Sequence, residues 1–156
     1  MNSQVQESKT DRELSITRTI AAHPTKVYEA WTQHVSEWWG PHGTNVPRWE
    51  MDLRPGGRFH VVMEFDGKQY DHTGTFLEVS PERIIVTDAF GANWEPNPDR
   101  FMVGMYEFEE TAEGTRLTAK ALHWDEEARQ KHEEMGFFNG WGQMLERLDT
   151  ASQVLP

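Results

Sequence analysis

The sequence predicts an α+β fold in which a curved antiparallel sheet of about seven strands wraps around a long C-terminal helix, with two short helices after the first strand. Between residues 47 and 124, apolar and polar residues alternate in segments separated by turn residues, which is typical of an antiparallel meander. Over residues 125–155 the apolar residues instead recur every three or four positions, as on one face of a helix. Because a strongly twisted sheet curls, we expect the helix to lie across its concave face and a cavity to remain between them.

The composition limits the function classes to which the chain can belong. We expect one domain over residues 13–156, preceded by a flexible polar arm over residues 1–12. The chain has no cysteine, which excludes a disulfide framework, a thiol nucleophile and a cysteine metal site. The formal net charge of −11, from 26 acidic and 15 basic residues, disfavours nucleic acid and anionic membranes as partners.

The sequence also bears on the location of the protein. Residues 1–7 are polar and lack the apolar segment of a signal peptide. No apolar run approaches the roughly 20 residues that a membrane-spanning helix needs, so membrane insertion is not expected. The absence of cysteine agrees with a reducing compartment, and we therefore expect a cytoplasmic protein.

One strand and two short helices are predicted near the N-terminus. Residues 13–20 alternate between apolar and polar side chains, as in a half-buried strand. A helix over residues 24–32 starts at Pro24, because the first helical turn has no use for the N–H that proline lacks. A second short helix over residues 35–39 ends at the Gly-Pro pair that follows, since proline cannot continue a helix.

The middle of the chain is predicted to be the antiparallel meander. Asp66-Gly67 is a strong hairpin signal between two alternating segments. Residues 91–100 contain Asn, Pro and Trp without periodicity, so we expect a loop there. The predicted strands cover residues 49–53, 58–65, 68–79, 83–90, 101–110 and 115–124.

Residues 125–155 are interpreted as a single helical element with an unusual centre. Gly136, Gly140 and Gly142 lie within it, and each glycine costs a helix roughly 1 kcal/mol relative to alanine. One interpretation is that these glycines allow the close approach of another backbone or leave room for a ligand. The alternative is that residues 136–139 break one helix and start another. The sequence leaves both interpretations open.

Large apolar side chains form the predicted ligand pocket. Trp38 and Trp39 precede a turn, and we expect them either at the mouth of the cavity or as core that closes one end of the sheet. Methionine and aromatic side chains suit an apolar ligand, although ordinary core packing is the alternative for most of them. The predicted pocket consists of Trp38, Trp39, Phe59, Met63, Phe76, Tyr106, Phe138, Trp141 and Leu145.

Four titratable residues in predicted strands are candidates for polar groups in the pocket. A neutral imidazole can act as a general base, and a carboxyl group in an apolar cavity can act as an acid. The strand face that points into the cavity is left open, because a bulge inverts the alternation. No metal-ligand spacing, nucleophile elbow, phosphate loop or nucleotide fingerprint occurs, so we assign no catalytic residue, metal or cofactor. The four candidates are His60, His72, Asp88 and His123.

Several short motifs together resemble one family. They are His23–Trp31, Trp38–Pro41, Asp52–Gly57, Gly74 before Phe76, Pro81–Ile84, Gly114–Thr118 and Gly140–Gly142 ahead of Leu145 and Leu148. Over residues 13–152 the chain is similar to the Hsp90 ATPase activator homologue (AHSA1-like) family of the SRPBCC, START-like and Bet v1-like superfamily. The resemblance implies the helix-grip fold. It implies no single activity, because the superfamily includes lipid and hormone binders, polyketide cyclases and co-chaperones.

Three functions are weighed. The leading hypothesis is a non-enzymatic domain that binds a small hydrophobic or amphipathic molecule between the C-terminal helix and the sheet. The family resemblance implies a second, a co-chaperone-like domain whose partner is a chaperone. The third is a small enzyme of cyclase type that uses a His or Asp in the pocket. A homodimer formed through exposed aromatics near Trp94 or through an edge strand is a further prediction.

Overall fold

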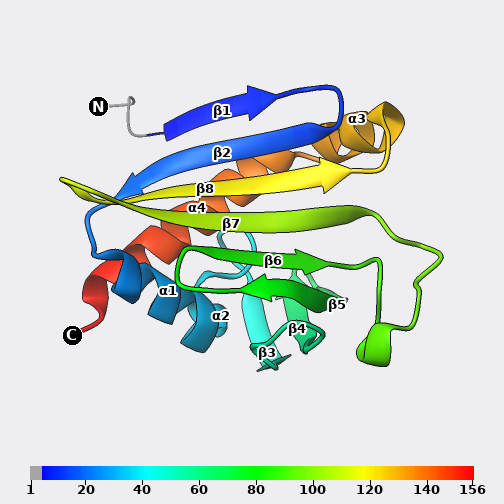
Figure 1. Cartoon of the computed structure of the whole chain (residues 1–156), viewed down its shortest axis with the longest axis horizontal. Helices are drawn as coiled ribbons and strands as arrows, with labels where there is room; N and C mark the ends of the chain where they lie inside the picture. Colours follow the sequence, from blue (N-terminus) through cyan, green and yellow to red (C-terminus); the bar gives the residue numbers. More distant parts are fainter. Residues whose placement is uncertain (1–4) are drawn as a thin grey trace.

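The computed structural model describes residues 5–156, which form one eight-stranded antiparallel sheet wrapped around a long helix. The strand order is β1-β2-β8-β7-β6-β5-β4-β3 (Figure 1). The strands are β1 (Val5–Lys9), β2 (Glu13–Ile20), β3 (Asn45–Met51), β4 (Arg58–Phe65), β5 (Lys68–Val79), β6 (Arg83–Thr87), β7 (Met102–Thr111) and β8 (Gly114–His123). The helices are α1 (Pro24–Gln33), α2 (Val35–Trp38), the single 3-10 turn η2 (Ala92–Trp94), α3 (Glu126–Glu134) and α4 (Phe137–Val154).

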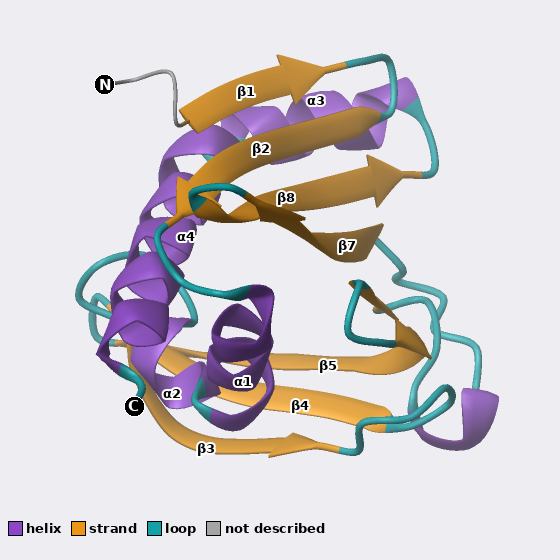
Figure 2. Cartoon of the chain, turned by 60° about the vertical axis from the view of Figure 1, so that its left-hand side comes forward, coloured by secondary structure: helices purple, strands orange, loops and turns teal. Residues whose placement is uncertain are grey.

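The sheet bends so strongly that its two ends lie on opposite sides of the molecule. Figure 2 shows β1, β2 and β8 on one side and β3, β4 and β5 on the other, with α4 running across the open side between them. The helices α1 and α2 pack against the C-terminal half of α4 and close that end. The predicted α+β class, the curved sheet and the two short helices are confirmed.

The eighth strand comes from the segment that the sequence placed in a flexible arm. Val5–Lys9 pairs in antiparallel register with β2, from Val5 opposite Arg18 to Lys9 opposite Leu14. All five residues are exposed. A strand with no buried face lacks the alternation by which strands are recognised, so the sequence pattern could not reveal it. Residues 5–9 of the predicted arm therefore belong to the sheet, and residues 1–4 lie outside the described residues.

The C-terminal segment is two helices, so the interpretation of one continuous helix is wrong and the alternative is right. Gly136, with φ +97°, separates α3 from α4 in the left-handed region that glycine adopts without strain. The Asp125 side chain caps α3 by accepting a hydrogen bond of 2.8 Å from the Ala128 N–H. Gly140 and Gly142 lie within α4, whose 18 residues make it the long helix that the sheet wraps.

An aromatic core fills the space where α1 and α2 meet the sheet. The Trp31 ring lies 5.1 Å from the Tyr106 ring and 5.4 Å from the Trp38 ring, measured between centroids. The Trp38 indole N–H donates to the Ala30 carbonyl at 3.0 Å, which satisfies it in the interior. Of the two interpretations of Trp38, core at one end of the sheet is correct, because this side chain is fully buried.

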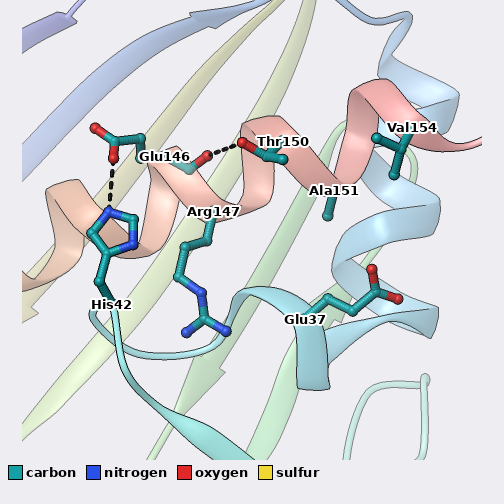
Figure 3. A pocket seen from close by; sticks show the side chains of 7 residues that line it. All are labelled: Glu37, His42, Glu146, Arg147, Thr150, Ala151 and Val154. Atoms are coloured by element: carbon teal, nitrogen blue, oxygen red, sulfur yellow. Dashed lines mark hydrogen bonds and ion pairs between the residues drawn. The ribbon is translucent and has the colours of Figure 1, made fainter.

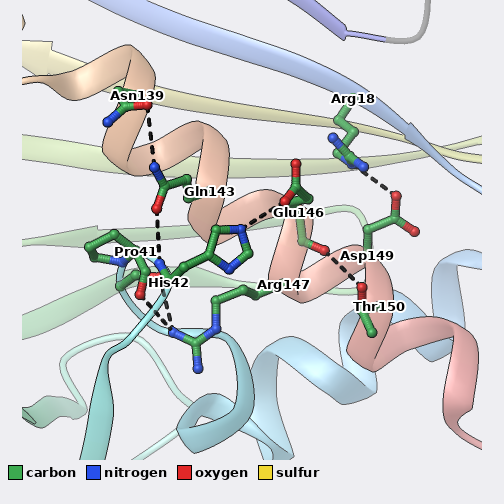
Figure 4. Close-up of polar contacts among 10 residues, drawn as sticks. Arg18, Pro41, His42, Asn139, Gln143, Glu146, Arg147, Asp149 and Thr150 are labelled. Carbon is green, nitrogen blue, oxygen red and sulfur yellow. Dashed lines mark hydrogen bonds and ion pairs between the residues drawn. The ribbon is translucent and has the colours of Figure 1, made fainter. Parts of the chain in front are cut away.

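Helix α4 is attached to the sheet by apolar contacts and by one ion pair. Leu145 and Leu148 are fully buried beneath it. The Arg18 guanidinium on β2 lies 2.8 Å from the Asp149 carboxylate on α4, in the contact that Figure 4 draws. Both side chains are largely buried, 22% and 11% exposed, so each charge depends on the other for its solvation. Within residues 5–156, none of the helices is long and apolar enough to cross a membrane.

Removing one partner of this ion pair should destabilise the fold. We expect Arg18→Ala to lower the free energy of unfolding by about 2–4 kcal/mol, because the buried Asp149 carboxylate loses its cation. Chemical denaturation measures the change. Arg116→Ala is the matched control, since Arg116 on the neighbouring β8 pairs with Glu109 in a contact whose side chains are 52% and 64% exposed. The control should lose less than about 1 kcal/mol, and equal losses in the two variants would contradict the role given to Arg18.

Candidate functional site

A cavity of about 550 Å³ lies between the concave face of the sheet and the helices α3 and α4. Strands β4, β5, β6 and β7 line it on one side, and the chain around Gly136 lines it on the other. Met135, 68% exposed, lies at its rim. Most of its lining is apolar, with a few polar groups among aromatic and methionine side chains.

Five of the nine predicted pocket residues line this cavity. Trp39, from the segment after α2, contributes its ring next to Phe59 on β4, with the ring centroids 5.3 Å apart. The Tyr106 ring on β7 is stacked on the Trp141 ring of α4 at 5.9 Å and an interplanar angle of 5°. Met63 completes the group. These side chains converge because inward-facing positions of separate strands meet the same face of α4.

The other four predicted pocket residues do not line the cavity. Trp38, Phe76 and Leu145 are fully buried in the core. Phe138 packs edge-on against Phe137 at 5.2 Å and is absent from the lining. The face of α4 that meets the cavity carries Phe137, Gly140, Trp141 and Met144, one position away from the predicted stripe of Phe138, Trp141 and Leu145. Trp141 belongs to both sets, so the prediction failed at Phe138 and Leu145, whose directions are set by how α4 packs against the sheet.

Two of the four predicted polar groups line the cavity. His72 on β5 has a buried Nε2 atom without a hydrogen-bond partner among the described residues, and burial lowers its pKa, while the neighbouring Asp71 raises it by less. Asp88 follows β6, where its Oδ1 accepts hydrogen bonds from the N–H groups of Phe101 (2.8 Å) and Met102 (3.2 Å). Asp88 therefore closes the loop that joins β6 to β7.

His60 and His123 correct the prediction in different ways. His60 lies opposite Thr73 in the register, on the convex face, where its Nε2 is 2.7 Å from Asp71 Oδ1. His123 lies on the concave side but is only 4% exposed and does not line the cavity. Another histidine, His132 on α3, covers it.

His132 belongs to the cavity wall and was missed by the sequence reasoning. Its neighbours in α3 are mostly charged, so the sequence indicates a solvent-exposed helix. The burial of His132 becomes evident only from the packing of α3 against other elements. Its ring packs against Phe101 at 4.9 Å, Phe137 at 5.1 Å and Trp141 at 6.0 Å. Phe101, Phe137, Met102 and Val86 also line the cavity outside the predicted set.

The two buried histidines form a hydrogen-bonded pair. His123 Nε2 lies 2.9 Å from His132 Nδ1, and His123 Nδ1 lies 2.8 Å from the Arg12 carbonyl oxygen. Burial lowers the pKa of His132 to about 4, with repulsion from His123 adding to the effect. Burial also lowers the pKa of His123, although its hydrogen bond to Arg12 opposes this. Both rings are therefore neutral at neutral pH.

Arg147 holds one wall of the cavity in place. Its guanidinium donates to the carbonyl oxygens of Trp39 (2.9 Å), Gly40 (3.1 Å) and Pro41 (3.3 Å), as Figure 4 shows in part. Burial lowers the pKa of Arg147. The next residue, His42, is bound to α4 as well, through the Gln143 side chain. The segment that carries Trp39 is thereby fixed to α4 rather than free to swing.

A second, smaller pocket of about 280 Å³ lies on the outer side of α4 (Figure 3). It is bordered by Glu37 and His42, and by Glu146, Arg147 and Val154 on α4. Its imidazole is already bound, since His42 Nε2 lies 2.7 Å from Glu146 Oε1. Across residues 5–156, no group of three or more His, Asp or Glu side chains is arranged to hold a metal ion.

The histidine pair predicts a loss of stability in mild acid. The pKa of His132 is about 4 in the folded protein and about 6.5 in an unfolded chain. Between these values the unfolded state binds more protons, so the free energy of unfolding should fall by roughly 1 kcal/mol for each unit that the pH decreases. Above about pH 6.5 the pair should contribute no pH dependence.

Urea denaturation at several pH values between about 4 and 7 measures this slope. His132→Asn is the comparison, because the amide keeps a donor for His123 but does not titrate. The variant should show a shallower slope over the same interval. Identical slopes for the two proteins would contradict the assignment of the acid sensitivity to His132.

Comparisons with known proteins support the fold and identify the family. Residues 21–153 match the family described as "Activator of Hsp90 ATPase homolog 1-like protein". A crystal structure of a protein from Nitrosomonas europaea is 33% identical and superposes with a TM-score of 0.89, covering 94% of this chain and 97% of that one. No curated protein matches the chain.

Two further structures show the same architecture at lower identity. A protein from Mycobacterium smegmatis is 27% identical, with a TM-score of 0.76 and coverage of 94% of this chain and 93% of that one. The AHSA1 protein from Silicibacter pomeroyi is 26% identical, with a TM-score of 0.66 and coverage of 88% and 95%. With a helix-grip architecture and a family match that spans most of its length, the chain belongs to the Activator of Hsp90 ATPase homolog 1-like family.

Proposed function

We propose that the protein binds a small hydrophobic or amphipathic molecule in the cavity between α4 and the sheet. The observation that carries the proposal is the cavity of about 550 Å³ with its mostly apolar wall. Cavities of roughly 300–1,000 Å³ with a few polar groups on an apolar lining are typical of small-molecule sites. A space of this size would be filled by core side chains if packing alone had shaped it.

The wall is suited to a ring-shaped apolar ligand. Trp39, Tyr106 and Trp141 offer flat surfaces, and Met63, Met102 and Met144 offer flexible side chains that adapt to an irregular outline. Gly140 has no side chain, and a Cβ atom added at this position would have no atom within 4 Å. The space next to Gly140 is therefore open. The glycine thus keeps open a volume that any larger residue on α4 would enter.

The proposal assigns no catalytic residue. The histidine and aspartate residues that line the cavity are His72, Asp88, His132 and Asp71, and Asp71 is already bound to His60. Asp88 is already engaged by two backbone N–H groups, and burial lowers the pKa of both histidines, which makes each of them a weaker base. Binding therefore agrees better with this wall than proton transfer does.

A cytoplasmic location and a homodimer through Trp94, which is 48% exposed, remain part of the proposal.

A chaperone-binding role is the second candidate, favoured by the description of the family. The acidic charge of −11 would place the contact on a basic surface of the chaperone. A pull-down with a purified Hsp90-type chaperone at low and high salt is the test. Salt-sensitive retention of the protein would favour this role, and no retention at low salt would exclude it.

Filling the cavity at Gly140 should abolish ligand binding without loss of stability. We expect Gly140→Leu to place its side chain in the cavity, and to stabilise α4 by roughly 0.5–1 kcal/mol because leucine is the better helix former. Gly142→Leu is the matched control, since Gly142 lies on the same helix, also has no atom within 4 Å of an added Cβ, and does not line the cavity. The control should gain similar stability and keep the ligand.

Native mass spectrometry, followed by mass spectrometry of what denaturation releases, measures occupancy in the three proteins. Wild type and Gly142→Leu should carry the same small apolar molecule, which Gly140→Leu should lack. If no molecule copurifies, naphthalene is added as a probe ligand, and its binding is measured from the NMR signals of the ¹³C-labelled methionine methyl groups. Met63, Met102 and Met144 line the cavity and should shift, whereas Met51 and Met105, outside it, should not. An unchanged cavity spectrum would contradict the proposal.

A further inference from the structure

Two imidazoles of the cavity wall have a ring nitrogen without a hydrogen-bond partner within residues 5–156. One belongs to His72, whose Nε2 is fully buried, and the other to His132, the only one of the two whose hydrogen-bonded neighbour fixes its tautomer. His132 is 8% exposed, and its Nδ1 is bound to His123. Its Nε2 has no hydrogen-bond partner within residues 5–156, although the residue lines the cavity. An unpaired polar atom in such a place costs free energy unless something else binds it. The position therefore points to a ligand group.

The chain of hydrogen bonds behind His132 determines which kind of group that is. A carbonyl oxygen only accepts, so the bond to Arg12 assigns the proton of His123 to Nδ1. The neutral His123 ring then has a free lone pair on Nε2, and His132 must donate to it from Nδ1. The neutral His132 ring is left with a lone pair and no proton on Nε2. Toward the cavity, this residue is an acceptor.

The charges around the cavity point in the same direction. Among the described residues that line it there is no lysine or arginine, whereas Asp71 and Asp88 are both acidic. Arg129, one turn before His132 on α3, is occupied by the Asp11 carbonyl and the Glu133 carboxylate. A carboxylate ligand would lose its hydration here without gaining a cation, which is strongly unfavourable. The site thus disfavours fatty acids and other anionic amphiphiles.

We propose that the cavity takes an uncharged ring compound with a hydroxyl group, and that this hydroxyl donates a hydrogen bond to His132 Nε2. The inference rests on the proposed binding function and specifies the ligand class. The ring of the ligand packs against the apolar wall, and its hydroxyl group donates to His132, whose tautomer is fixed by the hydrogen bond to His123. Phe101, Phe137 and Trp141 surround the imidazole of His132 and hold it in this orientation.

A matched series of probes tests the preference. Naphthalene, naphthol and naphthoate share one ring system and differ in offering no polar group, a neutral donor or an anion. Their affinities are measured by titration of the methyl signals of Met63, Met102 and Met144. Naphthol should bind wild type roughly tenfold more tightly than naphthalene, as one net hydrogen bond contributes, and naphthoate should bind most weakly.

Two variants separate the hydroxyl contact from the rest of the site. His132→Asn retains a donor for His123 but has no atom at the Nε2 position, so naphthol should lose its advantage while naphthalene binds as before. His60→Asn is the control, because His60 lies on the convex face, and it should keep the wild-type order of affinities. Two-bond ¹H–¹⁵N spectra of the free protein should show the Nδ1–H tautomer for both His123 and His132.

The possible results separate the ligand class from ligand binding itself. If naphthalene binds as tightly as naphthol, if naphthoate binds most tightly, or if His132 is the Nε2–H tautomer, the ligand class is wrong and the binding function stands. If none of the three probes shifts the cavity methionines, both the ligand class and the binding function fail. The expected order in wild type, lost in His132→Asn and kept in His60→Asn, supports both.

Discussion

The packing of one long helix across a strongly curved sheet is the constraint on which the rest of this structure depends. A curved surface and a straight cylinder contact each other only over part of their length. At its C-terminal half, α4 is held by Leu145, Leu148 and the Arg18–Asp149 ion pair, against β2 and the α1–α2 layer. At its N-terminal half the sheet turns away, and the cavity occupies the space that remains.

The protein maintains that space by rigid attachment around it. Arg147 binds three successive carbonyl oxygens of the segment that carries Trp39, and Asp88 closes the loop before β7. Gly136 lets the chain turn between α3 and α4, so that His132 and Phe137 both reach the same wall. Gly140 then leaves the centre of the wall without a side chain.

The polar groups of the cavity are positioned by the burial of their neighbours. His123 and His132 remain neutral because the surrounding aromatic rings remove water, and their mutual hydrogen bond compensates for part of that loss. In the proposed complex, the lone pair of this neutral pair accepts a hydrogen bond from the ligand, whereas a charged pair would attract anions. The apolar wall and the polar contact are therefore consequences of the same desolvation.

Several features followed from the sequence itself. The alternation of the strands, the Asp66-Gly67 turn and the helix start at Pro24 are local, because they depend on neighbouring side chains and on backbone preference. The same alternation places Phe59 and Met63 on one face and His60 on the other, as the structure has them. Trp39, Tyr106 and Trp141 were among the predicted pocket residues because aromatic side chains suit an apolar ligand, and the structure places all three in the cavity wall.

Tertiary structure decided what depends on distant neighbours. The exposed strand Val5–Lys9 forms only because β2 offers an unpaired edge, and no pattern within it records that partner. The cavity face of α4 carries Phe137 and Met144 rather than Phe138 and Leu145, because the packing of the helix against distant strands decides which side chains face the cavity. The roles of His123 and His132 also depend on tertiary structure. The two side chains become buried and hydrogen-bonded to each other only when α3 packs against the end of β8. The sequence determined most of the strands and helices and the side chains that they carry. The curvature of the sheet decided which of these side chains face the cavity.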